Sequence, residues 1–259
     1  MVAALLLDAV DRAAIEGTPA QAPVRLCERV DALRSLVATG QVRFIVSELR
    51  DRVGASVIPV LGEAAARRAR PTIVVRTTLT DAAAGDVIQC AVARIPAHVS
   101  IREAEPLASA MRDALGSGGE RFAGLAIIER VGPSVPLRLR AFVVLCAAAP
   151  SPRLHVARAA VLLGIGRRTI ESRLARAELP PAYRIIGWCV ALHAAWQLDV
   201  LDRRPKQVAA SFGFASGAAL ANLLARYCGC SATSLREHGA FSRQLERFAA
   251  LFERSAPIE

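Results

Sequence analysis

"VARAAVLLGIGRRTIESRL", residues 156–174, has the spacing of two short helices that cross at a tight turn. Ala160 stands where the first helix needs a small residue, so that the second helix can cross close to it. Gly164 follows four residues later and supplies the turn, because a residue without Cβ enters the left-handed region freely. Ile170 and Leu174 recur at the spacing of a buried helix face. The stretch therefore predicts a helix-turn-helix.

The outward face of the second helix of this motif is polar and mostly basic. In a DNA-bound helix-turn-helix, the first turns of the second helix lie in the major groove. An Arg forms a two-pronged hydrogen bond with guanine, and Glu accepts from the amino group of cytosine. The candidate DNA contacts are Arg167, Arg168, Glu171, Ser172 and Arg173. A structural hairpin with solvated arginines gives the same pattern, so the motif alone leaves both interpretations open.

The arrangement repeats in "VAASFGFASGAALANLL" (208–224), where Ala209 precedes Gly213 by four residues and Phe214 follows. The outward face of this second helix has little to read bases with. Only Asn222 carries a base-reading side chain, and Ala offers at most an apolar contact with a thymine methyl. We expect this face to add little to sequence choice. The candidate contacts are Gly217, Ala218, Ala221 and Asn222, with Arg226 and Arg236 at phosphates.

The second unit and its flank also carry a family resemblance, in Gly213-Phe214, Leu220, Leu224, Cys228-Gly229, Ser231 and Arg236. With two helix-turn-helix units joined by one long helix, residues 134–238 resemble the DNA-binding domain of the AraC/XylS family of bacterial transcription regulators. That family usually has aromatic residues where Leu220 and Leu224 stand, and Pro where Ala232 stands. These differences preserve apolar packing.

The resemblance implies an all-α domain over residues 134–259 that binds double-stranded DNA in a sequence-specific way and regulates transcription, with RNA polymerase as a further partner. The distribution of charge agrees with a polyanion partner. The chain has a net charge of +10, of which +9 lies in residues 134–259 and +1 in residues 1–133. The alternative is a docking protein whose DNA binding is vestigial, which the bland second helix favours.

Residues 1–133 alternate between strand-like and helix-like segments, which predicts an α/β domain with a parallel sheet covered on both faces. A glycine-rich break at 116–119 and a second at 131–136 place the boundary near residue 133. The expected strands are 42–49, 71–79 and 97–101, with a less certain first strand in "AALLL"; the expected helices are 24–40, 56–69, 81–92 and 103–115.

This half resembles, more loosely, the receiver domains of two-component response regulators. Ser47 or Glu48 stands where the family has its phosphate-accepting Asp, and only Asp8 and Asp11 fall in the region of its acidic metal-binding pair. Arg102 is the nearest counterpart of the switch Lys. The resemblance then implies a phosphorylation-independent pseudo-receiver that serves homodimerisation or partner binding. The alternative is a working phosphorylation-controlled receiver or a ligand sensor.

No nucleophile elbow, phosphate-binding loop or metal-ligand spacing is present in the sequence, so we expect no enzymatic activity, no cofactor and no metal. The six Cys are scattered and mostly lie in apolar runs, where they are expected to be buried free thiols. The longest uncharged stretches are shorter than the roughly 18–20 residues of a bilayer span. We therefore expect a cytoplasmic protein without membrane contact.

Overall fold

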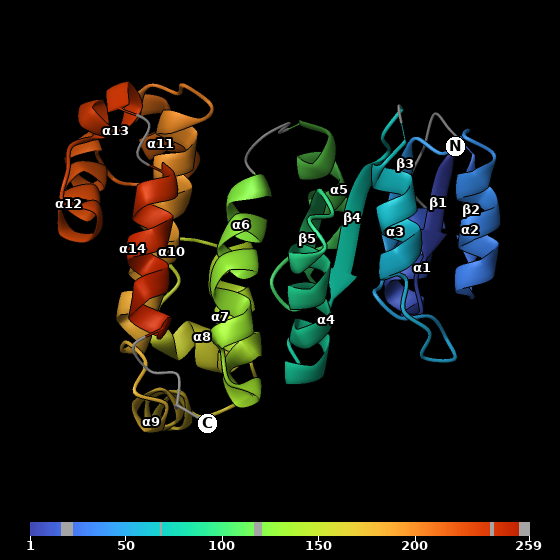
Figure 1. Ribbon diagram of the computed structural model, residues 1–259, viewed down its shortest axis with the longest axis horizontal. Helices are drawn as coiled ribbons and strands as arrows, with labels where there is room; N and C mark the ends of the chain where they lie inside the picture. The colour runs from blue at the N-terminus through green and yellow to red at the C-terminus, as the bar shows by residue number, and fades with distance from the viewer. Residues whose placement is uncertain (17–22, 68, 117–120, 239–240, 254–259) are drawn as a thin grey trace.

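The computed structural model describes residues 1–16, 23–67, 69–116, 121–238 and 241–253 (Figure 1). The strands of the N-terminal half form one sheet in the order β2-β1-β3-β4-β5, and every neighbouring pair is parallel. This order is one of the two common orders of doubly wound α/β folds. The predicted parallel sheet is confirmed. Its strands are β1 (Val2–Leu5), β2 (Val24–Cys27), β3 (Phe44–Ser47), β4 (Thr72–Thr77) and β5 (Ala97–Ile101).

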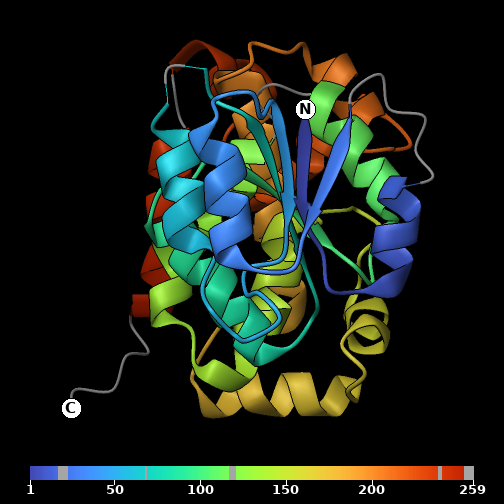
Figure 2. The ribbon, with the colours of Figure 1, turned by 90° about the vertical axis from the view of Figure 1, so that its right-hand side faces the viewer.

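Helices alternate with the strands and cover both faces of the sheet. Successive strand residues point to opposite faces, so Ala3 and Ile45 join the core under α2, α3 and α4, whereas Ala4 and Val46 pack with α1 and α5. Figure 2 shows α2 and α3 on one side of the strands and α1 on the other. These helices are α1 (Ala9–Glu16), α2 (Val30–Ala38), α3 (Ile58–Ala65), α4 (Asp81–Val92) and α5 (Leu107–Gly116).

The expected helix over residues 24–40 is wrong in its first part. Residues 24–27 are the edge strand β2, paired with β1, and the helix begins only at Val30. A carboxylate oxygen of Asp51 accepts a hydrogen bond from the Val30 amide at 3.0 Å, so a distant residue caps the start of α2. Four residues of strand are too few to display a period of two, and "VRLC" fits a helical period equally well.

The C-terminal half is helical, apart from short 3₁₀ turns η1 (Gly132–Ser134) and η2 (Leu137–Leu139) near its start. The predicted succession of helices is confirmed, and the last expected segment, residues 232–253, forms two helices. The elements are α7 (Arg140–Ala148), α8 (Val156–Leu162), α9 (Arg167–Arg176), α10 (Ala182–Asp199), α11 (Pro205–Ser211), α12 (Gly217–Cys228), α13 (Ala232–His238) and α14 (Phe241–Glu253).

The two halves meet through α6 (Arg121–Val131), a helix for which the sequence gives no expectation. It packs against α4 and β5 on one side and against α7, α10 and α14 on the other (Figure 1). A Cβ on Gly124 would lie 2.7 Å from the carbonyl oxygen of Ala147, so glycine allows α6 and α7 to touch. One buried apolar cluster runs through this junction. The boundary near residue 133 thus lies in a packed region, and the independence of residues 1–133 and 134–259 stays a prediction.

Candidate nucleic-acid interface

Helices α8 and α9 form a compact pair, here called the first helical pair. Gly164 ends α8 in the left-handed region, with φ of 63°. Its amide donates to the Val161 carbonyl at 3.1 Å, and the amide of Ile165 donates to the Ala160 carbonyl at the same distance. These two hydrogen bonds close the end of α8 as a Schellman motif, so the chain turns sharply into α9.

Helices α11 and α12, the second helical pair, reproduce this turn. Gly213 has φ of 69°, and its amide donates to the Ala210 carbonyl at 3.0 Å. The amide of Phe214 donates to the Ala209 carbonyl at 2.9 Å. Both first helices have seven residues. The helix caps Gly166 and Ser216 show that the second turn is one residue longer. The similarity of the two segments therefore extends from sequence to backbone hydrogen bonding.

The buried side of each second helix is the one that the sequence pattern predicts. Ile170 and Leu174 of α9 are buried against the rest of the helical half, and so are Leu220 and Leu224 of α12. The side of each helix opposite these buried residues therefore faces solvent. The residues Arg167, Arg168 and Ser172 on α9 and Gly217, Ala218, Ala221, Asn222 and Arg226 on α12 are all exposed.

The outward face of α9 carries an ion pair of its own. Nε of Arg167 lies 2.8 Å from Oε1 of Glu171, one helical turn away; the Arg167 side chain is largely exposed and that of Glu171 partly exposed. An exposed pair of this spacing stabilises a helix by only about 0.3–0.5 kcal/mol. Arg168 stands beside it on the exposed surface. Arg167 can therefore exchange its partner for a phosphate or a guanine at little cost.

Arg173 departs from the expected set. Its side chain is half-buried, and Nη1 donates a hydrogen bond to the Arg138 carbonyl at 3.0 Å. The residue thus ties α9 to η2 instead of joining the outward face with Arg167. Sequence spacing alone could not show this contact, because Arg138 lies in a separate element.

The outward face of α12 carries mostly small side chains, as its sequence predicts. Its start is capped by Ser216, whose hydroxyl accepts a hydrogen bond from the Ala219 amide at 3.3 Å. Ser216 is a functional N-cap that the sequence analysis did not single out. The guanidinium of Arg226 lies 5.7 Å from the ring centroid of Tyr227. Arg236 belongs to α13, and its side chain lies outside the part that the structure describes.

The connecting helix α10 holds both pairs. Trp188 packs against Tyr227 of α12 and Phe248 of α14, with ring centroids 5.8 and 5.7 Å away. Trp196 packs edge-on against Phe241 at 4.8 Å. Gly187 faces Tyr227 so closely that a Cβ would overlap the phenol. Helix α10 is buried along nearly its whole length and contacts α9, α11 and α12, so it joins the two pairs through the core.

The carboxyl edge of the sheet holds a network of arginines and carboxylates. Arg76 and Asp11 form a buried bidentate pair, with 3.0 Å between Nε and Oδ2 and 3.1 Å between Nη2 and Oδ1. Arg102 bridges the same Asp11, at 2.9 Å, and Glu48, at 3.0 Å. A hydrogen bond from the Asp11 backbone amide lowers the pKa of Asp8. The structure thus brings together Asp8, Asp11, Glu48 and Arg102, and each of these side chains has an internal partner.

The side chains of Glu48 and Ser47 at this edge make internal hydrogen bonds. Oε1 of Glu48 accepts from the backbone amides of Leu7 and Asp8 as well as from Arg102. Ser47 is fully buried, and its hydroxyl donates to the Glu48 carbonyl at 2.6 Å. Within the described ranges, no group of three or more His, Cys, Asp or Glu residues could hold a metal ion.

In comparisons with family models, curated proteins and solved structures, nothing matches this chain. Among the helices that the structure describes, none has both the length and the hydropathy needed to cross a membrane.

Proposed function

We propose that this chain is a sequence-specific, DNA-binding transcription regulator of the AraC/XylS type. In this proposal the two helical pairs are helix-turn-helix units, and α9 and α12 are their recognition helices. The observation that carries the proposal is the repeated turn at Gly164 and Gly213, with the same hydrogen bonds and with an exposed second helix each time. The same hydrogen bonds also close α4 at Arg94 and α9 at Glu178, so they are a common helix ending. What supports the proposal is that at Gly164 and Gly213 this ending leads within two or three residues into a second helix with an exposed outward face.

The first unit is the dominant reader. Arg167 and Arg168 are exposed on the first turn of α9, where a recognition helix meets base edges. A bidentate Arg–guanine contact discriminates between bases by about 1–3 kcal/mol, and an Ala contact with a thymine methyl supplies only a fraction of that. On α12, Asn222 is the exposed side chain with base-reading capacity, while Arg226 suits a phosphate.

The orientation of the two recognition helices supports unequal roles. Figure 1 shows α9 along its axis, whereas α12 runs across the view. The helices are therefore far from parallel, and a straight duplex cannot accept both lengthwise in its grooves. The duplex bends, or α12 lies over the backbone while α9 enters the groove.

The N-terminal half acts in this proposal as a pseudo-receiver that supports homodimerisation or partner binding in the cytoplasm. The support is the arginine network, in which Arg102 occupies both Glu48 and Asp11. A phosphorylated carboxylate at this edge would first have to break those ion pairs. RNA polymerase is the further partner that the family resemblance implies for an activator.

A second candidate function is protein docking with vestigial DNA binding. The observation in its favour is the small exposed side chains of α12, such as Ala218 and Ala221, which suit close contact with another protein.

Selection of binding sites from a random duplex library with the full-length chain tests the proposal. We expect an enriched motif with one strict, guanine-containing patch, and loss of that patch in Arg168→Ala. Arg94→Ala is the matched control, because it removes an exposed arginine of the N-terminal half that pairs with Glu129. Failure to enrich any motif, with folding intact, would favour the docking function.

A further inference from the structure

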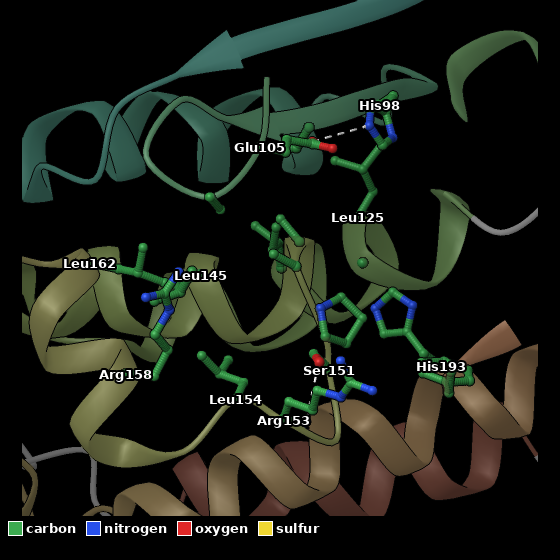
Figure 3. A pocket seen from close by; sticks show the side chains of 18 of the residues that line it. His98, Glu105, Leu125, Leu145, Ser151, Arg153, Leu154, Arg158, Leu162 and His193 are labelled. Carbon is green, nitrogen blue, oxygen red and sulfur yellow. Dashed lines mark hydrogen bonds and ion pairs between the residues drawn. The ribbon is translucent and has the colours of Figure 1, made fainter. Parts of the chain in front are cut away.

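A cavity of about 690 Å³ lies between the sheet and the two helical pairs (Figure 3). Its walls come from β5 and the loop after it, from α6, α7 and α10, and from the first helices of both pairs, α8 and α11. A volume of this size is typical of small-molecule sites, which range from roughly 300 to 1,000 Å³. The cavity is separate from the outward faces of α9 and α12.

One end of the cavity is lined by His98, whose buried Nε2 has no hydrogen-bond partner in the described part of the chain. Oε1 of Glu105 lies 3.6 Å from it, within ion-pair range but too far for a hydrogen bond (Figure 3). His98 and Glu105 both line the cavity, so this end of the cavity is polar.

The opposite side of the cavity carries positive charge. In Figure 3, Arg153 and Arg158 lie on the side away from His98 and Glu105. Both arginines are exposed, and neither has an ion-pair partner among the described residues. Guanidinium groups with free donors at the mouth of a cavity favour a carboxylate or a similar anion.

The walls between these two ends are apolar or neutral. Imidazole Nε2 of His193 donates to the Ala147 carbonyl at 2.8 Å, and Oε1 of Gln197 accepts from Ser211. Burial lowers the pKa of His193 to about 4, so the ring is neutral at physiological pH. Apolar lining comes from Leu125, Ile128, Leu145, Leu154, Leu162 and Phe212.

From this arrangement we propose that the cavity is a binding site for a small organic anion with an apolar body. The anionic group pairs with Arg153 and Arg158, the body packs on the leucine side chains, and the far end of the ligand lies beside His98 and Glu105. The ligand would touch α8 and α11 together and thereby bias the angle between the two helical pairs. This last step, control of DNA affinity, rests on the proposed function; the binding site itself does not.

Fluorescence of 1-anilinonaphthalene-8-sulfonate, an apolar organic anion, with the full-length protein tests the site directly. We expect saturable binding and displacement by octanoate at concentrations about tenfold lower than by 1-octanol, because only octanoate offers a charge to the arginines. The double variant Arg153→Gln/Arg158→Gln should abolish that tenfold preference. Arg94→Gln/Arg184→Gln removes the same charge from exposed positions away from the cavity and should retain it.

A cavity-filling variant guards against binding elsewhere. Ala148 lines the cavity, and Ala148→Phe should remove probe binding, with a melting curve to verify folding. Probe binding that survives both the filling and the arginine variants would overturn the site. Octanoate that binds as expected but leaves DNA affinity unchanged would overturn the regulatory step alone. Loss of the DNA-binding function would not alter the fluorescence result, so the two proposals fail separately.

Discussion

The guanidinium of Arg76 and the carboxylate of Asp11 face each other as a two-pronged ion pair, with both side chains almost fully buried. Arg76 uses its remaining nitrogen to donate to the Ser100 hydroxyl at 2.6 Å and to the Glu105 carbonyl at 2.9 Å. The pair thus links α1, β4, β5 and the loop that borders the cavity. These hydrogen bonds hold α1 and the loop after β5 against the carboxyl ends of β4 and β5.

Asp11→Asn should destabilise the protein by about 3 kcal/mol, because it leaves the Arg76 charge buried beside a neutral amide. Urea unfolding followed by circular dichroism measures the change. Glu129→Gln breaks the exposed pair with Arg94 and should cost at most about 1 kcal/mol. Equal effects of the two substitutions would mean that the buried network contributes no more than a surface pair.

Acetyl phosphate should leave no acyl phosphate on the protein. Glu48 and Asp11 are held by Arg102, and Ser47 donates its hydroxyl proton to a backbone carbonyl. Intact-mass spectrometry with and without Mg²⁺ provides the measurement. A stable adduct that maps to Asp8, Asp11 or Asp51 would contradict the pseudo-receiver interpretation.

Binding to duplex DNA should weaken by orders of magnitude between about 50 and 200 mM salt, because the basic half displaces counterions from several phosphates.

In a base-substitution scan of the selected site, Arg167→Ala or Arg168→Ala should relax preference at one base pair by about 1–3 kcal/mol. Arg226→Ala should weaken all sequences alike. If the strict patch responds to Asn222→Ala and ignores the arginine pair, α12 is the reading helix.

Gly164→Ala and Gly213→Ala should each destabilise the protein by about 1–2 kcal/mol through backbone strain, because both positions have positive φ. The added methyl group would meet no atom within 4 Å at either position, so steric overlap does not contribute. Gly217→Ala is the matched control: its surroundings are equally open, but its backbone is helical, so Ala should be neutral or slightly stabilising. Thermal unfolding of the three variants separates strain from helix propensity.

Stability should fall as the pH is lowered from 6.5 to 4, because burial lowers the pKa of His193 from 6.5 to about 4. Between these values the unfolded chain binds a proton that the folded chain excludes, which removes up to about 3 kcal/mol of stability. His193→Gln should flatten this part of the stability profile, whereas His155→Gln, at an exposed position, should retain it. Urea midpoints measured at intervals of pH test the difference.

Strong local patterns in the sequence were sufficient for parts of the fold. The expected helix over 81–92 and strand over 97–101 coincide with α4 and β5, because Thr80 caps the helix and apolar residues fill the strand. The pattern predicts a helix where the edge strand β2 lies, since the four residues of this strand have no distinct period. The sequence pattern does not predict helix α6, because the helix is apolar on several sides and follows a glycine-rich segment.

The candidate interface was predictable in its backbone and less so in its contacts. Glycine spacing located both turns, and apolar spacing located the buried positions of α9 and α12. The inward contact of Arg173 depends on η2, which no local pattern indicates. The sequence does not predict the cavity either, because its lining residues, such as His98, Arg158 and Phe212, come together from distant parts of the chain.

The tight contact between Gly124 and the carbonyl of Ala147 has a consequence for how such a chain can evolve. Domains joined by an exposed linker that few contacts cross can be exchanged as units. Here α6 packs against the sheet and the helical half at once, so a crossover near residue 133 would strip α7 and α10 of an apolar neighbour. A substitution on one side of α6 is therefore expected to require a compensating substitution on the other side. Exchange of a whole half for an unrelated domain would leave α6 without a fitting surface.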